Sequence, residues 1–221
     1  MECMIRRSAL VVCILVFAAQ ASAEVVLLSQ SRSVFAVAWV SPVGMWSSDS
    51  LSAPDFGLFE EDVSAFGWGP WGSEAEGFAT QVSEIQTSHF SINGTASANA
   101  RDGGWSEAGY GESTGRSIFE VLFEVAEPTP FSLAGTLARS GASLQLDRDG
   151  APYMSFGPDG NYEIMVSEGG ILEPGAYALT VKAMAFTARY SGYSSFDIDF
   201  FMETPVAVDQ MAWGQVKTLF R

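Results

Sequence analysis

Apolar and polar residues alternate along most of the chain that follows residue 24. In SIFEVLFEVAE (117–127) the apolar residues take every second position from Phe119 to Val125, and glutamates lie between them. In SFDIDFFME (195–203) apolar positions alternate with Asp197, Asp199 and Glu203. A period of two is typical of a strand with one face buried. Further strands are predicted for FSLAGTLA, ASLQLD, NYEIMV and AYALTVKAMAF.

Turn-forming residues separate these runs. Asp149-Gly150 and Asp159-Gly160 indicate short hairpin turns, and Glu173-Pro174-Gly175 places Pro and Gly where a tight turn needs them.

The first half of the chain is less regular but has the same character. EVVLLS (24–29) and SVFAVAWV (33–40) predict buried strands, and DFGLFEEDVSAFGW (55–68) predicts a short strand pair. We expect a turn at Asn93-Gly94 and a long loop over the Gly-rich residues 97–115. Helical periodicity is absent before residue 205. The sequence therefore predicts an all-β fold, a two-sheet antiparallel sandwich of jelly-roll-like size, in one domain over residues 24–205.

Residues 1–23 have the order of a secretory signal peptide. Arg6 and Arg7 precede the apolar run LVVCILVFAA, and small residues end the segment at Ala23. The alternatives are a lipoprotein acylated at Cys13 and a retained anchor, but the run is shorter than the ~20 residues that span a bilayer. We expect cleavage after Ala23 and a secreted product, extracellular or at the cell surface, with the periplasm as an alternative.

Charge and cysteine content narrow the partners. The formal net charge is −15, and loss of Arg6, Arg7 and Glu2 with the signal peptide makes it one unit more negative. Such acidity without a basic run excludes nucleic acid as an expected partner. Both cysteines lie in the leader, so the mature chain is expected to have no disulfide and no thiolate site. We expect a monomer without a membrane span.

Several segments carry a resemblance to a known class. DFGLFEEDVSA, QVSEIQTSHFSINGTASA, SIFEVLFEVAEPTPFSLAGTLA, GGILEPGAYALTVKA and SFDIDFFME follow one another in order. This series resembles the secreted β-sandwich domains of bacterial exported proteins of the PEP-CTERM, exosortase-sorted class. The resemblance implies an exported, non-catalytic sandwich and transfers no catalytic residue. The Pro-Glu-Pro anchor of that class is missing, because Thr204-Pro205 leads only to VAVDQMAWGQVKTLFR.

The sequence gives little support for a catalytic site. His89 is the only histidine, so a Ser-His-Asp triad or an imidazole zinc site would depend on it alone. Asp197 and Asp199 share a strand face about 7 Å apart, which is a geometry that glycoside hydrolysis can use. Alternating acids on an exposed strand also serve solubility and protect an edge. We therefore expect that the protein is not an enzyme and place a glycoside hydrolase third among the alternatives.

Calcium is the one cofactor that the residues suggest. Its oxygen ligands would come from Asp147, Asp149, Asp159 and Asn161. The alternative is that these side chains cap local backbone amides in Asp-Gly turns, and we expect this second interpretation to hold and no cofactor to be needed.

Aromatic residues among glycines suggest a binding role. FGWGPWG and GGWSEAGYG present Trp68, Trp71, Trp105 and Tyr110. Exposed aromatic rings can stack on sugars through their flat apolar faces, although Trp68 and Trp71 could also cover one end of the core. The expected function is a structural or interaction role at or outside the cell surface, with extracellular polysaccharide or cell-surface components as partners. A carbohydrate-binding module is the alternative.

The C-terminal tail, residues 206–221, has a different pattern. With Asp209 as N-cap, a short amphipathic helix would align Trp213, Val216 and Phe220 and place Lys217 and Arg221 near its C-terminus. The tail is similar to short Trp-Gly endings of other exported bacterial proteins. It is expected either to dock on the sandwich or to act as a sorting or attachment signal.

Overall fold

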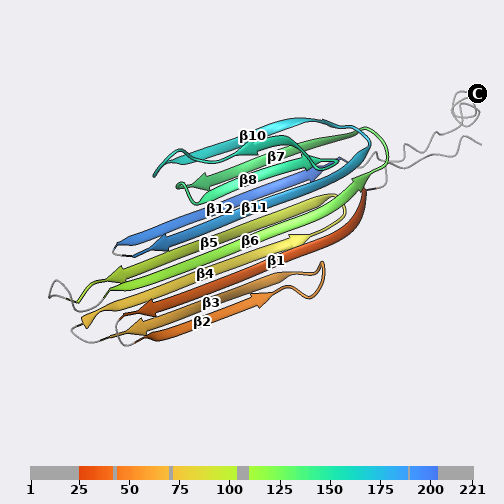
Figure 1. Cartoon of the computed structure of the whole chain (residues 1–221). Coiled ribbons are helices and arrows are strands. Elements are labelled where there is room, and N and C mark those ends of the chain that lie inside the picture. Colours follow the sequence, from red (N-terminus) through yellow and green to blue (C-terminus); the bar gives the residue numbers. More distant parts are fainter. Residues whose placement is uncertain (1–24, 42–43, 70–71, 104–109, 189, 204–221) are drawn as a thin grey trace, which may run out of the picture. The chain divides into compact units, whose positions relative to one another are not determined.

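The protein folds as two antiparallel sheets. The computed structural model describes residues 25–41, 44–69, 72–103, 110–188 and 190–203 (Figure 1). The strands of this described part are β1 (Val25–Val40), β2 (Met45–Ser52), β3 (Phe59–Trp68), β4 (Glu74–Ile85), β5 (His89–Arg101), β6 (Gly111–Val125), β7 (Thr129–Ala138), β8 (Ala142–Arg148), β9 (Ala151–Phe156), β10 (Glu163–Leu172), β11 (Gly175–Thr187) and β12 (Ser191–Met202). The predicted signal peptide and C-terminal helix lie outside the described residues.

Each sheet contains six strands. One sheet, here called sheet A, has the order β2-β1-β6-β11-β8-β9, and the other, sheet B, has the order β10-β7-β12-β5-β4-β3. From β5 onward every connection except β8–β9 crosses from one sheet to the other, which gives the sandwich its jelly-roll-like character. The predicted all-β, two-sheet antiparallel sandwich is confirmed. In the described ranges no helix is long and apolar enough to cross a membrane.

The strands predicted from alternation are confirmed, but one predicted turn and one predicted hairpin are not. The predicted turn at Asn93-Gly94 was wrong, because both residues lie inside β5. Asp149-Gly150 does join the β8–β9 hairpin, with Asp149 at a φ of 51° and Gly150 at 79°. Asp159-Gly160, in contrast, connects β9 of sheet A to β10 of sheet B, so it is no hairpin.

Two other expectations needed correction. The predicted strand pair over residues 55–68 is the single strand β3 with a preceding turn. The long loop expected over residues 97–115 is much shorter, because β5 extends to Arg101 and β6 begins at Gly111. The small residues of this segment fit a narrow space between the two sheets.

The core is wide in one part and narrow in another. The wide part contains packed aromatic rings, including Phe90, Phe123 and Phe200, whose centroids lie 5.4–5.9 Å apart. Phe90 stacks on Phe200 and meets Phe123 edge-on. The narrow part is built from small residues such as Ala36, Ala38, Ala75 and Ala79. A Cβ placed on Gly77 would lie 2.5 Å from the carbonyl oxygen of Thr114 in the opposite sheet, and one on Gly115 would lie 2.2 Å from that of Phe78. The two backbones are therefore in direct contact there.

A buried polar network separates the two parts of the core. Along β4, Gln81 and Ser83 lie between Ala79 of the narrow part and Ile85 of the wide part. Arg32 of β1 reaches across the sandwich and donates to the carbonyl oxygen of Ser83 at 3.1 Å and to its hydroxyl at 3.3 Å. Its other nitrogens donate to Gln30 and to the carbonyl of Asp55. The guanidinium thereby joins sheet A to sheet B and to the β2–β3 connection.

Candidate ligand-binding groove

A groove lies on the outer face of sheet B, where the strand register brings polar and aromatic side chains together. Residues directly across an antiparallel pair point to the same face. One row of neighbours runs Trp68, Glu74 and Arg101 across β3, β4 and β5. The next row runs Phe66, Glu76, Asn99 and Ser191 across β3, β4, β5 and β12. Both rows are at the end of the sandwich that carries the β3–β4 and β11–β12 connections, on the left in Figure 1.

Apart from Trp68, these residues line a groove of about 470 Å³, together with Ala75, Ala100 and Tyr190. Phe66 is 53% exposed on one side, and Tyr190 is 80% exposed on the other. Trp68, 60% exposed, stands beside Glu74 on the neighbouring strand. The backbone of Tyr190 is fixed, because its carbonyl accepts a hydrogen bond from the amide of Ala100 at 3.0 Å. Two aromatic rings thus flank a polar floor.

The polar floor offers donors and acceptors in close succession. Glu74 and Glu76 supply carboxylate acceptors, Arg101 supplies guanidinium donors, and Asn99 supplies both. In the described ranges the ion pairs formed are His89–Asp199 and Arg148–Asp149, so these charged groups have none with one another. No group of three or more His, Cys, Asp or Glu side chains in the described ranges is placed to hold a metal. The groove is therefore equipped to bind a ligand rich in hydroxyl groups.

Of the aromatic residues predicted from the sequence, Trp68 lies beside Glu74 of this groove but is not among the residues that line it. Tyr110 lies elsewhere: its ring packs edge-on against Trp39 at 5.2 Å, on the outer face of sheet A. Trp71 and Trp105 are outside the described residues. The structure therefore places Trp68 and Tyr110 on opposite outer faces and does not join them in one site.

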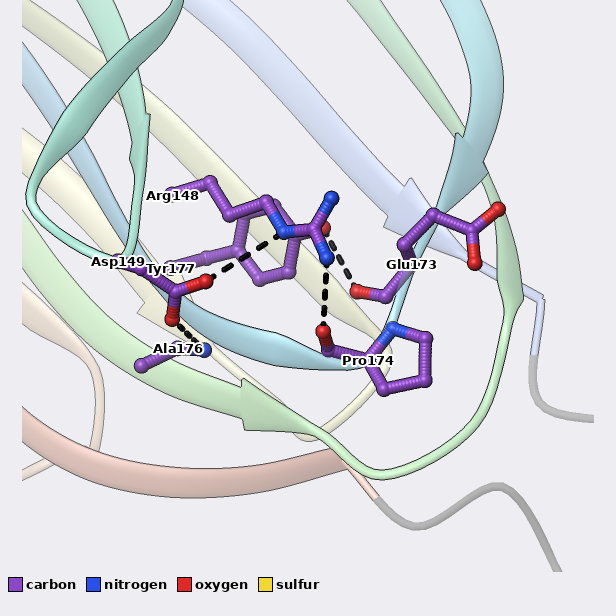
Figure 2. Close-up of polar contacts among 6 residues, drawn as sticks. All are labelled: Arg148, Asp149, Glu173, Pro174, Ala176 and Tyr177. Carbon is purple, nitrogen blue, oxygen red and sulfur yellow. Dashed lines mark hydrogen bonds and ion pairs between the residues drawn. The ribbon is translucent and has the colours of Figure 1, made fainter.

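Two of the candidate calcium ligands, Asp147 and Asp149, make other contacts. Figure 2 shows Asp149 at the β8–β9 turn, where its carboxylate accepts a hydrogen bond from the amide of Ala176 at 3.1 Å. The other carboxylate oxygen lies 3.6 Å from Nε of Arg148, whose guanidinium also donates to the carbonyl of Pro174 at 3.0 Å. Asp147 accepts from the side-chain amide of Gln145 at 2.7 Å. A cation already stands beside Asp149, which disfavours a second cation at the same place.

Asp159 and Asn161 lie apart from that turn, in the β9–β10 connection, and both are exposed. Asn161 lines a different hollow, described below. The arrangement matches the turn-capping interpretation at Asp149, while the calcium hypothesis stays a prediction for the other residues.

Tyr177 belongs to the same cluster, and Figure 2 shows it beneath Arg148. Its hydroxyl donates to the carbonyl of Glu173 at 2.7 Å, which fixes the β10–β11 connection to the core. Burial raises the pKa of Tyr177, and the nearby positive charge of Arg148 partly opposes this effect. The cluster therefore fastens the β8–β9 turn to the β10–β11 connection at one end of the sandwich.

The residues considered for catalysis lie on an open strand face. Nε2 of His89 is 3.0 Å from a carboxylate oxygen of Asp199, and both side chains are substantially exposed. Asp197 is also exposed, two residues away on β12. Neither Asp197 nor Asp199 lines the groove.

Sequence reasoning missed most of the groove. Phe66 and Trp68 are two residues apart in β3 and so share a face, which the sequence could have indicated. Glu74, Glu76, Asn99, Arg101 and Tyr190 come from other strands, and only the tertiary pairing brings them together. The tail residues Trp213, Val216, Lys217, Phe220 and Arg221 lie outside the described part of the chain.

Comparisons with known proteins give no family. No protein family profile matches the chain, and no curated protein matches it. Among solved structures, a GH31 alpha-xylosidase from Xanthomonas citri aligns with 9% identity and a TM-score of 0.17. The alignment covers 73% of this chain but 30% of that one, so the chain spans less than a third of the xylosidase. A likeness at this level carries no argument about function.

Proposed function

We propose that the protein is a non-catalytic binding protein that holds neutral polysaccharide in the groove on the outer face of sheet B. The observation that carries the proposal is the combination of Phe66 and Tyr190 around a floor of Glu74, Glu76 and Asn99. Sugar rings have flat apolar faces that stack on aromatic rings, and hydroxyl groups that pair with carboxylates and amides.

Charge favours a neutral ligand over a polyanion. The chain has a formal net charge of −15, and the groove itself holds two glutamates against one arginine. Such a field repels a polymer with many carboxylate or sulfate groups. A neutral polysaccharide is not repelled by this charge.

The more general alternative is a structural or interaction role without a glycan. It is disfavoured by the groove's exposed rings, because large apolar side chains grouped on a surface usually mark a binding site. The binding proposal also fits an exported protein, since polysaccharides of this kind are met outside the cell. We propose that the protein acts at the cell surface or in the medium.

Affinity electrophoresis tests the proposed function. The parent and its variants migrate through gels containing soluble β-glucan, dextran, galactomannan or the polyanion alginate. At least one neutral polymer should retard the parent, and alginate should not. Phe66→Ala and Trp68→Ala should each weaken the retardation roughly tenfold, the effect of losing ~1.4 kcal/mol of stacking.

Trp46→Ala is the matched control for Trp68→Ala. Trp46 is 67% exposed on β2 of sheet A and does not line the groove. This variant should bind like the parent. No retardation of the parent by any neutral polymer, or equal losses in Trp46→Ala and Trp68→Ala, would contradict the proposed site.

Secretion is tested separately by fractionating cells that express the full-length chain beside a chain lacking residues 211–221. The full-length protein should appear outside the cytoplasm. If the tail is a sorting signal, its removal relocates the protein without unfolding it, whereas a large loss of stability would favour a docked helix.

A further inference from the structure

A second hollow adjoins the groove. It has a volume of about 250 Å³ and is bounded by Arg139, Asn161, Phe186 and Tyr193, together with Ser191. We call it the Arg139 hollow. Ser191 lines the groove as well, so the two depressions meet at the first residue of β12.

The register explains why the two depressions meet. Ser191 lies opposite Asn99 of the groove floor, and Tyr193 follows two residues later on the same strand face, about 7 Å further along. Tyr193 is 43% exposed. A ligand that leaves the groove over Ser191 therefore reaches the ring of Tyr193 next.

The ring of Tyr193 is held by a cation. The guanidinium carbon of Arg139 lies 5.7 Å from the centroid of this ring, in a cation–π contact. Because the guanidinium covers one part of the aromatic surface and the side chain remains partly exposed, Tyr193 presents an oriented ring to solvent. An oriented aromatic ring loses little conformational freedom when a sugar stacks on it.

The backbone at Arg139 is unusual. Its φ of 68° lies in the left-handed region, which glycine adopts easily and a long side chain does not. The conformation is fixed by hydrogen bonds from the amide of Arg139 to the carbonyl of Tyr162, at 2.8 Å, and from Ala142 to the carbonyl of Arg139, at 2.9 Å. A turn of this shape favours glycine, so the arginine is best explained by what its side chain does. Strain of this kind is common at binding sites.

We infer that the groove and the Arg139 hollow are adjoining parts of one elongated site, and that the ligand is a chain of several sugar units. This inference rests on the proposed function. It assigns Tyr193 as a second stacking platform and Arg139 as the residue that positions it.

Chain-length dependence of affinity tests the inference. The ligands are a disaccharide and a hexasaccharide of whichever neutral polymer (β-glucan, dextran or galactomannan) retards the parent, measured by titration calorimetry. The parent should bind the hexasaccharide more tightly. Tyr193→Ala and Arg139→Gly should weaken hexasaccharide binding roughly tenfold and leave disaccharide binding unchanged. Phe66→Ala should weaken both.

Two variants distinguish a loss of hexasaccharide binding from a loss of folding. Arg139→Gly relieves the left-handed backbone, so its thermal midpoint should be equal to or higher than that of the parent. Tyr153→Ala is the control for Tyr193→Ala, because Tyr153 is 44% exposed but lies on β9, at the far edge of sheet A. It should bind both ligands like the parent.

The outcomes distinguish the two proposals. If Phe66→Ala weakens binding while Tyr193→Ala and Arg139→Gly leave hexasaccharide affinity unchanged, the elongated site is wrong and the groove stands. If Phe66→Ala also has no effect, both the proposed function and the inference fail. Equal affinity of the parent for both chain lengths would also overturn the inference.

Discussion

Arg32 is a fully buried cation in a strongly acidic protein, and no carboxylate oxygen accepts from it among the described residues. Burial lowers its pKa, while the charge of Asp55 acts in the opposite direction. Four of its hydrogen bonds end on Ser83, Gln30 and Asp55. Removing the guanidinium would take a buried donor from Gln30, Asp55 and the Ser83 carbonyl, although the side-chain amide of Gln81 would still donate to the Ser83 hydroxyl. The loss of a buried hydrogen bond is more costly than the loss of an exposed one.

Replacement of Arg32 by methionine should therefore lower the free energy of unfolding by about 3 kcal/mol, as measured by urea denaturation. Arg116→Met is the control, since Arg116 is exposed and stacks over Phe35 at 5.9 Å. That variant should lose less than about 1 kcal/mol. Equal stability of the two variants would show that the buried network does not hold the sheets together.

The raised pKa of Tyr177 predicts how the stability of the folded state changes with pH. Burial raises its pKa in the folded state above the ordinary value of 10.0, so the unfolded chain releases the proton first as pH rises. The stability that depends on the neutral hydroxyl is complete below pH 10.0 and is lost as pH rises through the folded-state pKa.

Tyr177→Phe removes this titration together with the hydrogen bond to Glu173. The variant should be about 1 kcal/mol less stable near pH 8, and the difference from the parent should shrink by about pH 11. Urea denaturation at both pH values measures it. Tyr162→Phe, at an exposed position, should run parallel to the parent. A constant difference between Tyr177→Phe and the parent would contradict the assignment.

At the level of strands, the alternation of apolar and polar residues predicted the elements that have one buried face. It did not predict the segments in which small residues pack between the sheets. β6 and β12 could be predicted because apolar residues alternate with acidic residues along their sequences. The Gly-rich, polar composition of residues 97–115 predicts a loop, yet Ala98 and Ala100 are buried and Gly115 lies where the two sheets touch. Likewise Gly94 is not a turn residue: a Cβ there would lie 2.4 Å from the ring of Phe196. Composition alone does not distinguish a loop from a thin core.

This close approach predicts severe effects of adding one methyl group. Gly77→Ala and Gly115→Ala would each drive a Cβ into a carbonyl of the opposite sheet, so the sheets must separate. Each should destabilise the protein by about 3 kcal/mol or more, measured by thermal or urea denaturation. Gly157→Ala is the control, since a Cβ there would lie an ordinary 3.5 Å from the nearest atom. Small losses at Gly77 and Gly115 would mean that the sheets are further apart.

For the whole molecule, the class of fold was predictable and the site was not. Alternation reports which face of a strand is buried, but not which strand lies beside it. β6 pairs with β1 and β11, which are far apart in the sequence, and β5 pairs with β12. The groove depends on the pairing of β5 with β12, since its floor combines β4, β5 and β12. Trp68 alone indicated the correct face.

The net charge of −15 supplies a prediction that involves the entire molecule. Few of its acids are paired in the described ranges, so folding concentrates negative charge and salt should stabilise the folded state. The thermal midpoint should rise by a few degrees between about 0.01 M and about 0.15 M NaCl, as the screening length falls from about 30 Å to about 8 Å. The rise should then level off; a steady increase up to 1 M would instead indicate exclusion of salt from the surface.

Ligand binding measured over the same salt range distinguishes the effect of charge on stability from its effect on affinity. Because a neutral polysaccharide carries no charge for salt to screen, its affinity should change less than about twofold while the thermal midpoint rises. Electrostatic attraction would instead make affinity fall steeply as salt is added. Such a fall would mean that Arg101 and Arg139 hold an anionic ligand, and it would contradict the neutral class proposed for the groove.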